Sequence, residues 1–368
     1  MNKKNIFICC TEQSGENICY NILQRLDLKN INVDGVCGSR SEKYFKHKYY
    51  DISEFKSIGL FEVIFSLRKY LKIIKLLNFE ILKKNYDLVI CIDSPDFNYQ
   101  LAKSLRKYGF SKKIIQIVAP TVWAWRPRRS EKFAKLFNEI FLLFNFEKKY
   151  FQFKNFTSTF IGHPVFHINK RPEKINYQYI AFLFGSRENE IKKLFKYFDT
   201  LEKYISLNKP NLKILIPTLP HLVSIIKKRT ANWKSKILIS SDINNFDKLY
   251  EDVFISVTCS GTASLEVAKR NIPQIVVYKL NFFTEFILKF FVKVNNACIL
   301  NIISKKIIIP ELVNSKLTNK NLINEFTKLV NDENYRKNQI NNINVFMPHI
   351  ITEISPYEIS SKRILSLI

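Results

Sequence analysis

The feature that most constrains the fold of this chain is an alternation of short apolar runs with amphipathic helical patterns. Residues 5–10 and 87–93 are apolar runs, each followed by a polar turn and then by a helical pattern, and 114–118 is a third run of this kind. Strands that alternate with helices are typical of a parallel sheet with helices on both faces. The sequence therefore predicts an α/β fold with a doubly wound sheet.

The alternation begins again after a polar stretch at 167–178, which has the composition of a linker. Beyond this stretch lie further strand-like runs at 179–184, 212–216, 237–239, 254–257 and 275–278. We therefore expect two Rossmann-like domains, over 1–165 and 166–344, with the C-terminal tail 345–368 returning to the first.

Charge narrows the class of partner. The chain has 58 Lys and Arg against 32 Asp and Glu, a net charge of +26, which favours nucleic acid, an acidic membrane surface or phosphorylated substrates. A nucleic-acid-binding protein would gather its basic residues on one face with stacking aromatics, whereas here they are spread along the whole chain. We therefore expect no nucleic-acid partner.

Cysteine usage and hydropathy bear on the compartment. The seven Cys residues form no C-x-x-C pair, which favours a reducing compartment over a disulfide framework. The apolar run at 272–294 is interrupted by Lys279, Glu285, Lys289 and Lys293, so it fails as a membrane-spanning helix. We expect a cytoplasmic protein, with attachment to a membrane surface left open.

Four polar clusters follow predicted strands, at 11–16, 93–98, 184–190 and 259–266. Ligands of open α/β sheets bind where the carboxyl ends of strands meet helix N-termini, and Gly-rich helix starts suit a diphosphate. In the second half this interpretation singles out Arg187 as a phosphate donor and Glu266 as a partner for a ribose diol. The alternative is that the Ser, Thr and Gly residues only cap helices and form turns.

Two carboxylates stand in the cluster at 93–98. Asp93 directly follows a buried-type strand, which is a suitable setting for a general base. The alternative is that Asp93 or Asp96 simply caps the helix that follows. We interpret Asp93 as a residue that takes part in the reaction and Asp96 as a residue with a partly structural role.

The segment 122–129 is the least ordinary in the chain, with Trp123 and Trp125 followed by three Arg residues. Trp in a loop is usually a packing residue, but beside clustered Arg it can hold a phosphorylated amphiphile. His163 and His167 have the spacing of metal ligands on a helix, but Pro164 lies between them and a third ligand is missing. We expect no metal.

Two segments have an amphipathic pattern. In 60–77, Leu60, Ile64, Leu67, Leu71 and Ile74 fall on one helical face with basic residues beside them, and 282–294 has the same character. A helix that faces the core and a helix that lies in a membrane interface both fit this pattern. The sequence does not decide between them.

Taken in order, the clusters resemble one bacterial family, the lipid-A-disaccharide synthases, along nearly the whole chain. The matching segments are TEQSGE at 11–16, IGLFEV at 58–63, IDSPDFN at 92–98, VAPTVWAWRPRR at 118–129, FNFEKKYF at 144–151, FIGHP at 160–164, GSRENEI at 185–191 and SGTASLE at 260–266. The resemblance implies a GT-B fold, in which two Rossmann-like domains face a cleft, without cofactor or metal. It also implies an inverting glycosyltransferase that joins UDP-2,3-diacylglucosamine to 2,3-diacylglucosamine 1-phosphate (lipid X), giving lipid A disaccharide 1-phosphate and UDP.

The resemblance further implies roles for individual residues. Asp93 would be the base, and Asn301, placed by a looser match over 291–301, would be a second catalytic residue. The first domain would face acceptor and membrane, and its expected substrate-binding residues are Glu12, Ser14, Gly15, Asp96, Trp123 and Arg126. The second domain would bind the UDP-sugar, and its expected residues are Gly185, Ser186, Arg187, Glu190, Ser260, Gly261, Thr262 and Glu266. The protein would act on the inner face of the inner membrane, at an anionic surface, and the sequence leaves open whether two copies form a homodimer.

The chain departs from the family pattern at a few loop positions. Thr11 stands in place of Gly, Glu16 in place of Asp, and Phe184 and Leu300 in place of Pro. These changes bear on loop geometry. The nearest rivals are a peptidoglycan glucosaminyltransferase and a UDP-sugar 2-epimerase, neither of which carries IDSPDFN or VWAWRPRR.

Overall fold

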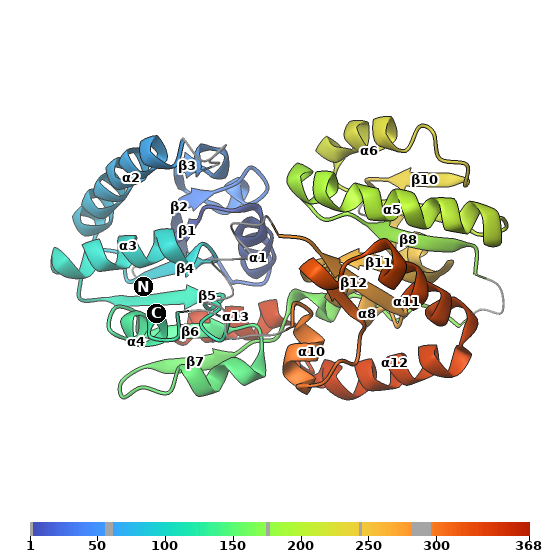
Figure 1. Ribbon diagram of the computed structural model, residues 1–368. Helices are drawn as coiled ribbons and strands as arrows, with labels where there is room; N and C mark the ends of the chain where they lie inside the picture. Colours follow the sequence, from blue (N-terminus) through green and yellow to red (C-terminus); the bar gives the residue numbers. More distant parts are fainter. Residues whose placement is uncertain (1–2, 56–61, 125, 174–176, 243–244, 281–295) are drawn as a thin grey trace. The chain divides into compact units, whose positions relative to one another are not determined.

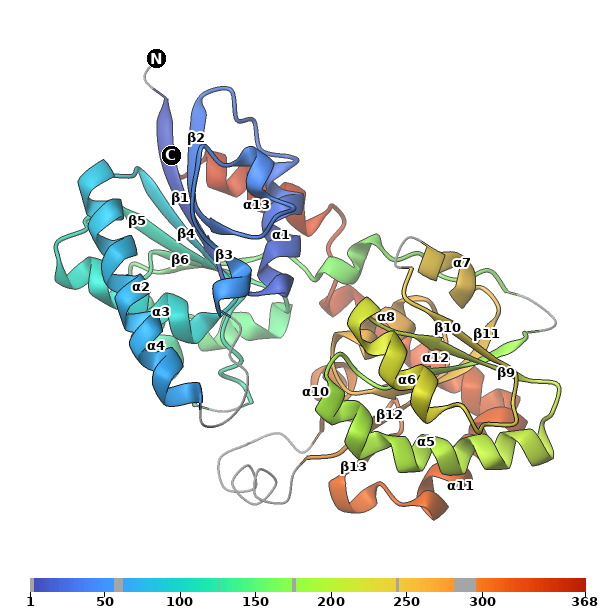
Figure 2. The ribbon, with the colours of Figure 1, turned by 90° about the horizontal axis from the view of Figure 1, so that it is seen from above.

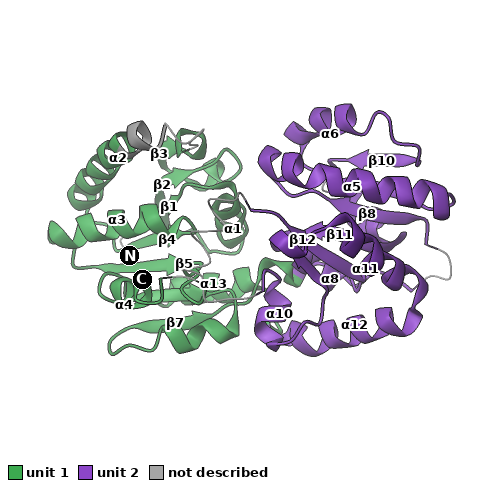
Figure 3. Cartoon of the chain, in the orientation of Figure 1, with its two compact units in different colours: residues 1–166, 350–368 green, residues 167–349 purple. Residues whose placement is uncertain are grey.

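The computed structural model describes residues 3–55, 62–124, 126–173, 177–242, 245–280 and 296–368, with backbone only for 62–67. Within this range the chain forms two compact units (Figure 3). Unit 1 comprises Met1–Phe166 and Ile350–Ile368, and unit 2 comprises His167–His349. Each unit is a parallel sheet covered by helices, which confirms the predicted α/β class.

Unit 1 contains a parallel sheet of seven described strands in the order β3-β2-β1-β4-β5-β6-β7 (Figure 1). The strands are β1 Lys4–Cys10, β2 Ile31–Cys37, β3 His47–Asp51, β4 Leu88–Ile92, β5 Lys113–Ile117, β6 Glu139–Leu142 and β7 Thr157–Phe160. Its helices are α1 Gln13–Leu23, α2 Glu62–Lys84, α3 Pro95–Lys107, α4 Arg129–Ala134 and α13 Pro356–Leu365. The central strands β1 and β4 are buried on both faces, as expected for a doubly wound sheet.

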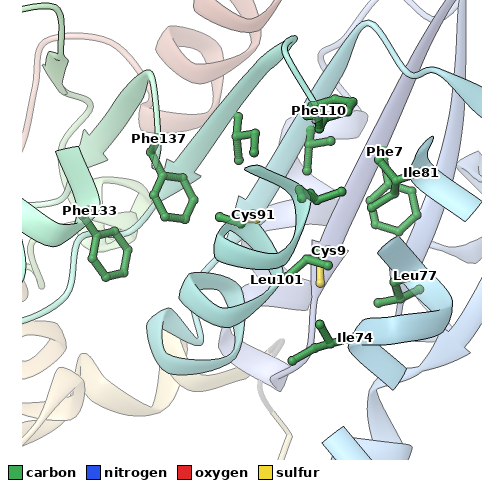
Figure 4. Packing of buried hydrophobic residues seen from close by; sticks show 14 of the residues in the cluster. Phe7, Cys9, Ile74, Leu77, Ile81, Cys91, Leu101, Phe110, Phe133 and Phe137 are labelled. Carbon is green, nitrogen blue, oxygen red and sulfur yellow. The ribbon is translucent and has the colours of Figure 1, made fainter. Parts of the chain in front are cut away.

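Alternate residues of the central strands supply two separate cores in unit 1. Phe7 and Cys9 point to the face covered by α2, α3 and α4, where Leu77 and Leu101 pack (Figure 4). Their neighbours Ile6 and Ile8 point to the opposite face, which α1 and α13 cover. This period of two is the ordinary consequence of strand geometry.

Unit 2 contains a parallel sheet of six described strands in the order β10-β9-β8-β11-β12-β13. Figure 2 shows this unit turned by 90° from the view of Figure 1. The strands are β8 Tyr179–Leu183, β9 Lys213–Pro217, β10 Ile237–Ser240, β11 Val253–Cys259, β12 Gln274–Tyr278 and β13 Glu311–Val313. The helices are α5 Glu188–Asn208, α6 Val223–Arg229, α7 Phe246–Tyr250, α8 Thr262–Lys269, α10 Ile299–Ser304, α11 Asn319–Asn331 and α12 Glu333–Phe346. One face carries α5, α6 and α11, and the other carries α7 and α8.

The C-terminal helix α13 is tied into unit 1 by a buried ion pair. Glu139, at the start of β6, is 2% exposed and accepts three hydrogen bonds of 2.9–3.1 Å from the Arg363 guanidinium. Thr159 Oγ1 donates to the same carboxylate at 2.6 Å. Ser361 Oγ also donates to Arg25 O beyond α1. The tail therefore completes the core that α1 begins.

Helix α2 differs from the face predicted for it. Leu71, expected on the apolar face with Ile74, is 55% exposed, while Ile73, Ile74 and Leu77 are buried. The side chains of Leu60, Ile64 and Leu67, and all of 282–294, lie outside the described residues. No helix in the described ranges is long and apolar enough to cross a membrane.

Candidate active site

The first candidate site lies where β1 and β4 end in unit 1. Gly15, in the first turn of α1, lets this helix approach the end of β4, because a Cβ there would lie 3.2 Å from Ile92 O and 3.3 Å from Asp93 Cβ. The close approach brings the Ser14 hydroxyl to Asp93, and Ser14 Oγ donates a hydrogen bond to Asp93 Oδ2. Asp93 is half-buried. The structure therefore brings together Ser14, Gly15 and Asp93.

Two further contacts join the loops of this site. Ser94 Oγ donates to Glu12 Oε1 at 2.9 Å, which links the start of α1 to the start of α3. Asp96 is exposed and accepts a hydrogen bond of 2.6 Å from Arg129 Nη2. The two carboxylates of the DSPD segment therefore differ: Asp96 is neutralised by an arginine, whereas Asp93 accepts from a hydroxyl.

The turn that carries Asp93 has an unusual backbone. Asp93 and Ser94 have φ angles of 56° and 39°, in the left-handed region that non-glycine residues rarely adopt. Asn98 Nδ2 donates to Asp93 O at 2.7 Å and Gln116 Nε2 donates to the same oxygen at 2.9 Å. Both amide side chains are fully buried.

A cavity of about 1,180 Å³ opens beside this turn within unit 1. Its lining includes five apolar or aromatic side chains, Phe55, Tyr70, Leu71, Ile74 and Phe97, together with a group of basic residues. The basic residues are Arg126, Arg128, Arg129 and Lys132. Thr11, Glu12, Ser94 and Asp96 also line the cavity, while Asp93 lies next to the lining residue Ser94 in the chain. A molecule with both an acyl chain and a phosphate matches a lining that contains apolar and basic side chains.

Trp123 is half-buried and does not line this cavity. Its indole Nε1 donates to Glu147 Oε1 at 3.1 Å, and its ring packs edge-on against Phe146. Glu147 is 2% exposed and also accepts from Phe144 N at 3.2 Å. Burial raises the pKa of this carboxyl from its ordinary value to about 8.

His163 is also a buried structural residue. Its Nδ1 accepts a hydrogen bond from Val165 N at 3.2 Å, and its ring stacks on Phe144. Burial lowers the pKa of the imidazole to about 4. A neutral ring whose Nδ1 is occupied by a backbone donor accounts for His163 without a metal.

The second candidate site lies at the strand ends of unit 2. A cavity of about 430 Å³ is lined by all eight residues expected to bind the UDP-sugar, Gly185, Ser186, Arg187, Glu190, Ser260, Gly261, Thr262 and Glu266. Thr218, Phe246 and Tyr250 line it as well. The topological switch point between β8 and β11 places both glycine-containing loops at one edge of the sheet.

The two loops differ in their backbone amides. At the start of α5, Glu190 Oε2 accepts from Ser186 N at 2.9 Å and from Arg187 N at 3.2 Å. A Cβ on Gly185, whose φ is 101°, would collide with this carboxylate. The amides at the start of α5 are thus already used by the protein, while the Arg187 side chain is 77% exposed and lies 3.6 Å from Glu190 Oε1.

The start of α8 is open in comparison. Gly261 has a φ of 145° and a Cβ built on it meets no described atom within 4 Å. Ser264 N donates to Gly261 O at 3.1 Å, while Thr262 and Ala263, at the start of the helix, line the cavity. The first turn of a helix is a favourable place for an anion. Glu266 lies one turn further on, and burial raises the pKa of its carboxyl while the Arg270 guanidinium opposes that rise.

Asn301 lines neither cavity. Its side chain is fully buried, with Nδ2 donating to Ile309 O at 2.8 Å and Oδ1 accepting from Ile308 N and Ile309 N. In the structure, the Asn301 side chain is therefore hydrogen-bonded to the backbone of the segment that precedes β13.

Comparison with known proteins identifies the chain. The model of the lipid-A-disaccharide synthetase family matches residues 6–358. The chain belongs to this family. It is 31% identical to the lipid-A-disaccharide synthase of Rickettsia typhi over 350 residues, which cover 92% of each chain. It is 32% identical to the enzyme of that name from Wigglesworthia glossinidia brevipalpis, covering 91% of each chain. As a member of the lipid-A-disaccharide synthetase family, it is a glycosyltransferase of lipid A biosynthesis.

Solved structures agree on the fold. The calicheamicin glycosyltransferase CalG4 matches with a TM-score of 0.63 and 11% identity, covering 100% of this chain and 98% of that one. The UDP-GlcNAc 2-epimerase of Neisseria meningitidis bound to UDP-GlcNAc matches with a TM-score of 0.61, 13% identity and coverage of 100% and 99%. MurG of Acinetobacter baumannii matches with a TM-score of 0.59 and 12% identity, covering 100% of this chain and 99% of that one. These likenesses confirm the GT-B fold that the lipid-A-disaccharide synthetase family resemblance implies.

Two of the residues that depart from the lipid-A-disaccharide synthetase pattern, Glu16 and Phe184, are buried and make contacts of their own. Glu16 is 1% exposed and accepts from Gly38 N at 2.8 Å and Ser41 N at 2.7 Å, so it holds the loop after β2. Phe184 is 2% exposed and packs on Phe198 and Phe195 under α5. Both substituted residues are integrated into their loops.

Sequence reasoning missed three residues of this lipid-A-disaccharide synthetase site. Asn98 and Glu147 stand inside recognised segments without a role assigned to them, and Gln116 is a polar residue inside the apolar run at 114–118. A polar side chain within a buried strand is a signal that it must have a hydrogen-bond partner. Gln116 carried that signal, and the structure shows the partner to be the backbone of Asp93.

Proposed function

We propose that this protein is the inverting glycosyltransferase that transfers 2,3-diacylglucosamine from UDP to 2,3-diacylglucosamine 1-phosphate (lipid X). The observation that carries this proposal is the Asp93 carboxylate, which accepts from Ser14 Oγ and stands next in the chain to Ser94, a lining residue of a cavity with both apolar and basic side chains. An acceptor with acyl chains, a phosphate and a hydroxyl to be deprotonated requires these three features together.

The donor is assigned to the cavity of unit 2. The diphosphate is placed at the start of α8, where first-turn amides and the helix dipole favour an anion. Arg187 supplies a charged side-chain donor from the facing loop. Glu266, one turn into α8, is placed to accept from the ribose hydroxyls. The UDP-GlcNAc 2-epimerase of the same fold is bound to UDP-GlcNAc, which supports a nucleotide-sugar ligand for this chain.

The acceptor is assigned to the cavity of unit 1. Its acyl chains would lie against Phe55, Tyr70, Leu71 and Phe97, and its phosphate against Arg126 and the basic residues that follow it. The expected phosphate contacts are the four basic residues that line the cavity, Arg126, Arg128, Arg129 and Lys132, of which Arg129 also pairs with Asp96. Trp123 supports the loop that carries these residues.

The mechanism follows from the two assignments. Asp93 accepts the proton of the acceptor hydroxyl as that oxygen attacks the anomeric carbon from the side opposite UDP. Arg187 and the α8 amides stabilise the negative charge that develops on the departing diphosphate. Ser14 orients the Asp93 carboxylate. Asn301 acts indirectly, by fixing the backbone of 308–309 from inside unit 2.

Work at a membrane is the natural setting for two diacylated substrates, and α2 is the proposed contact. Leu71, Leu76 and Phe79 are 55–60% exposed on this helix, beside Lys72 and Lys75. Apolar side chains with a basic flank suit an anionic surface. We therefore place the protein peripherally on the inner face of the inner membrane.

The test is transfer by the purified protein with UDP-2,3-diacylglucosamine and lipid X, without added metal. UDP release and disaccharide 1-phosphate are followed by mass spectrometry, with Asp93→Asn as the matched variant. We expect product from the native protein. In the variant, turnover should fall about 100-fold or more, while UDP affinity is retained. Intact UDP affinity without product would reject lipid X as the acceptor, and near-normal turnover of Asp93→Asn would reject the base.

A further inference from the structure

The backbone that carries the proposed base is strained. Two consecutive non-glycine residues, Asp93 and Ser94, occupy the left-handed region, which is sterically unfavourable for residues with a Cβ. Such a turn persists only where the surrounding structure over-determines it. The carbonyl of Asp93 shows which side chains do so.

Asp93 O receives two side-chain hydrogen bonds from different elements. Asn98 Nδ2 donates from α3 at 2.7 Å, and Gln116 Nε2 donates from β5 at 2.9 Å. A carbonyl oxygen only accepts, so the NH₂ end of each amide must face it. Among the described residues neither Asn98 Oδ1 nor Gln116 Oε1 has a hydrogen-bond partner. Each buried amide therefore serves here as a donor.

Gln116 also ties the turn to the neighbouring strand. Its Nε2 lies 3.1 Å from both Ile117 O and Val118 O, and Asp93 N donates to Ile117 O at 2.9 Å. Val118, with a φ of 72°, is itself left-handed. One buried amide thus connects the strained ends of β4 and β5.

We propose that Asn98 and Gln116 are positioning residues for the reaction, which together fix the left-handed turn that aims the Asp93 carboxylate. This proposal rests on the proposed function, because it takes Asp93 as the base. Two donors hold the Asp93 carbonyl, and Ser14 Oγ donates to the carboxylate of the same residue, so the orientation of the side chain depends on the turn that the two amides hold. Loss of either donor lets the turn relax toward ordinary φ values and moves the carboxylate.

The predicted signature is a loss of turnover without a loss of binding. A displacement of about 1 Å at a catalytic group costs up to about 100-fold in rate. Asn98→Ala and Gln116→Met should each lower kcat about 10-fold or more, with KM for both substrates within about threefold of native. UDP affinity, measured by calorimetry, should stay unchanged because its proposed site is in unit 2.

A merely structural role is separated from a positioning role by repeating both substitutions in the Asp93→Asn background. If the two amides act through the carboxylate, they cannot matter once the carboxylate is gone, and residual turnover should fall no further than about twofold. Asn78→Ala is the matched control, since Asn78 is a buried amide of α2 in the same unit whose Oδ1 has no hydrogen-bond partner among the described residues and which donates neither of the two hydrogen bonds to Asp93 O described above. It should lower thermal stability without a change in kcat.

Equal fold losses in the native and Asp93→Asn backgrounds would overturn the positioning role, as would native kcat in both single variants. These results are distinct from failure of the proposed function, which would appear as near-normal turnover of Asp93→Asn alone.

Discussion

At the scale of single residues, Glu190 shows that the residues of one recognised motif can have different roles. The sequence places Gly185, Ser186, Arg187 and Glu190 together as ligand-binding residues. In the structure the Glu190 carboxylate takes the two amides that a phosphate would otherwise use. This contact favours an indirect role for Glu190, in which it shapes the loop and steadies the Arg187 guanidinium.

Substitutions at Glu190 separate these roles. Glu190→Gln keeps an oxygen that accepts from both amides, so we expect UDP affinity within about threefold of native. Glu190→Ala removes the acceptor and the partner of Arg187, and should weaken UDP binding about 10-fold, measured by calorimetry. Asp332→Ala, which removes the cap of α12 in the same unit, is the control for loss of a helix cap. Tighter UDP binding by Glu190→Ala would show instead that the freed amides bind the diphosphate themselves.

Residue identity alone could not predict these contacts, because they depend on which backbone groups the fold leaves unpaired. Asn301 illustrates the limit. An Asn side chain can bind a ligand as well as a backbone group, and only the structure shows that Asn301, in α10, is hydrogen-bonded to the backbone of Ile308 and Ile309. Gly15 was predictable as a close-approach position, but not that the approach brings Ser14 to Asp93.

At the scale of elements, the sequence predicts those with a strong period and misses those without one. The apolar runs at 5–10, 87–93 and 179–184 correspond to β1, β4 and β8, the strands at the centre of each sheet. Strand β13 has three residues and β6 and β7 have four each, too few to show a period. Strand β2 carries Asp34 and Gly35, which break its apolar pattern.

Helix α2 shows a different failure of pattern reading. Its predicted apolar face included Leu71, which is exposed, because the buried stripe runs through Ile73, Ile74, Leu77 and Ile81. A helix with apolar residues on more than one side fits two rotations about its axis, and packing against the sheet selects one. The apolar residues left outside are those that the proposed function assigns to acyl chains and lipid.

The buried carboxyl of Glu147 predicts a pH dependence of stability. Glu147 lies in the 310-helical segment Asn145–Tyr150 and accepts a hydrogen bond from Trp123 in the loop after β5. Glu147, with a pKa of about 8 when folded, holds a proton that the unfolded chain has already released above about 4.5. The folded state therefore binds more protons between these values, and its stability falls as pH rises. His163 has the opposite sign, because its lowered pKa makes stability rise with pH, but only below about 6.5.

Glu147→Gln should remove the slope above about pH 6.5. Its amide still accepts from Trp123 but cannot accept from Phe144 N, so we expect an added destabilisation that does not vary with pH. Urea unfolding between about pH 6.5 and 8.5 measures the slope, and Glu333→Gln, at an exposed carboxyl, is the control. An unchanged slope in Glu147→Gln would mean that another group carries the titration.

At the scale of the whole molecule, the two units divide the chemistry. Within the described residues, unit 1 has an amphipathic cavity with a carboxylate beside it, and unit 2 has a polar cavity with helix starts around it, each at the carboxyl ends of strands. The net charge of +26 gives both sites a favourable field for phosphorylated ligands. Neither charge nor fold distinguishes the family from other GT-B proteins, since CalG4 and the epimerase share the fold at 11–13% identity. The ordered set of loop segments does so.

The exposed apolar residues of α2 give the last prediction, which concerns the molecule at a lipid surface. Leu76 and Phe79 are 55% and 60% exposed, and neither lines the cavity of unit 1. Transfer of two such side chains into lipid contributes about 3 kcal/mol or more, so Leu76→Glu with Phe79→Glu should weaken binding to anionic vesicles at least about 10-fold. Sedimentation with vesicles that contain phosphatidylglycerol measures this. Leu207→Glu in α5, where the native side chain is 76% exposed, is the matched control and should leave binding unchanged.

Because the cavity and Asp93 are untouched, transfer between substrates dispersed in detergent should remain near native in the double variant. Native vesicle binding by that variant would exclude α2 as the contact with lipid, and loss of both vesicle binding and detergent-phase transfer would indicate damage to unit 1 instead.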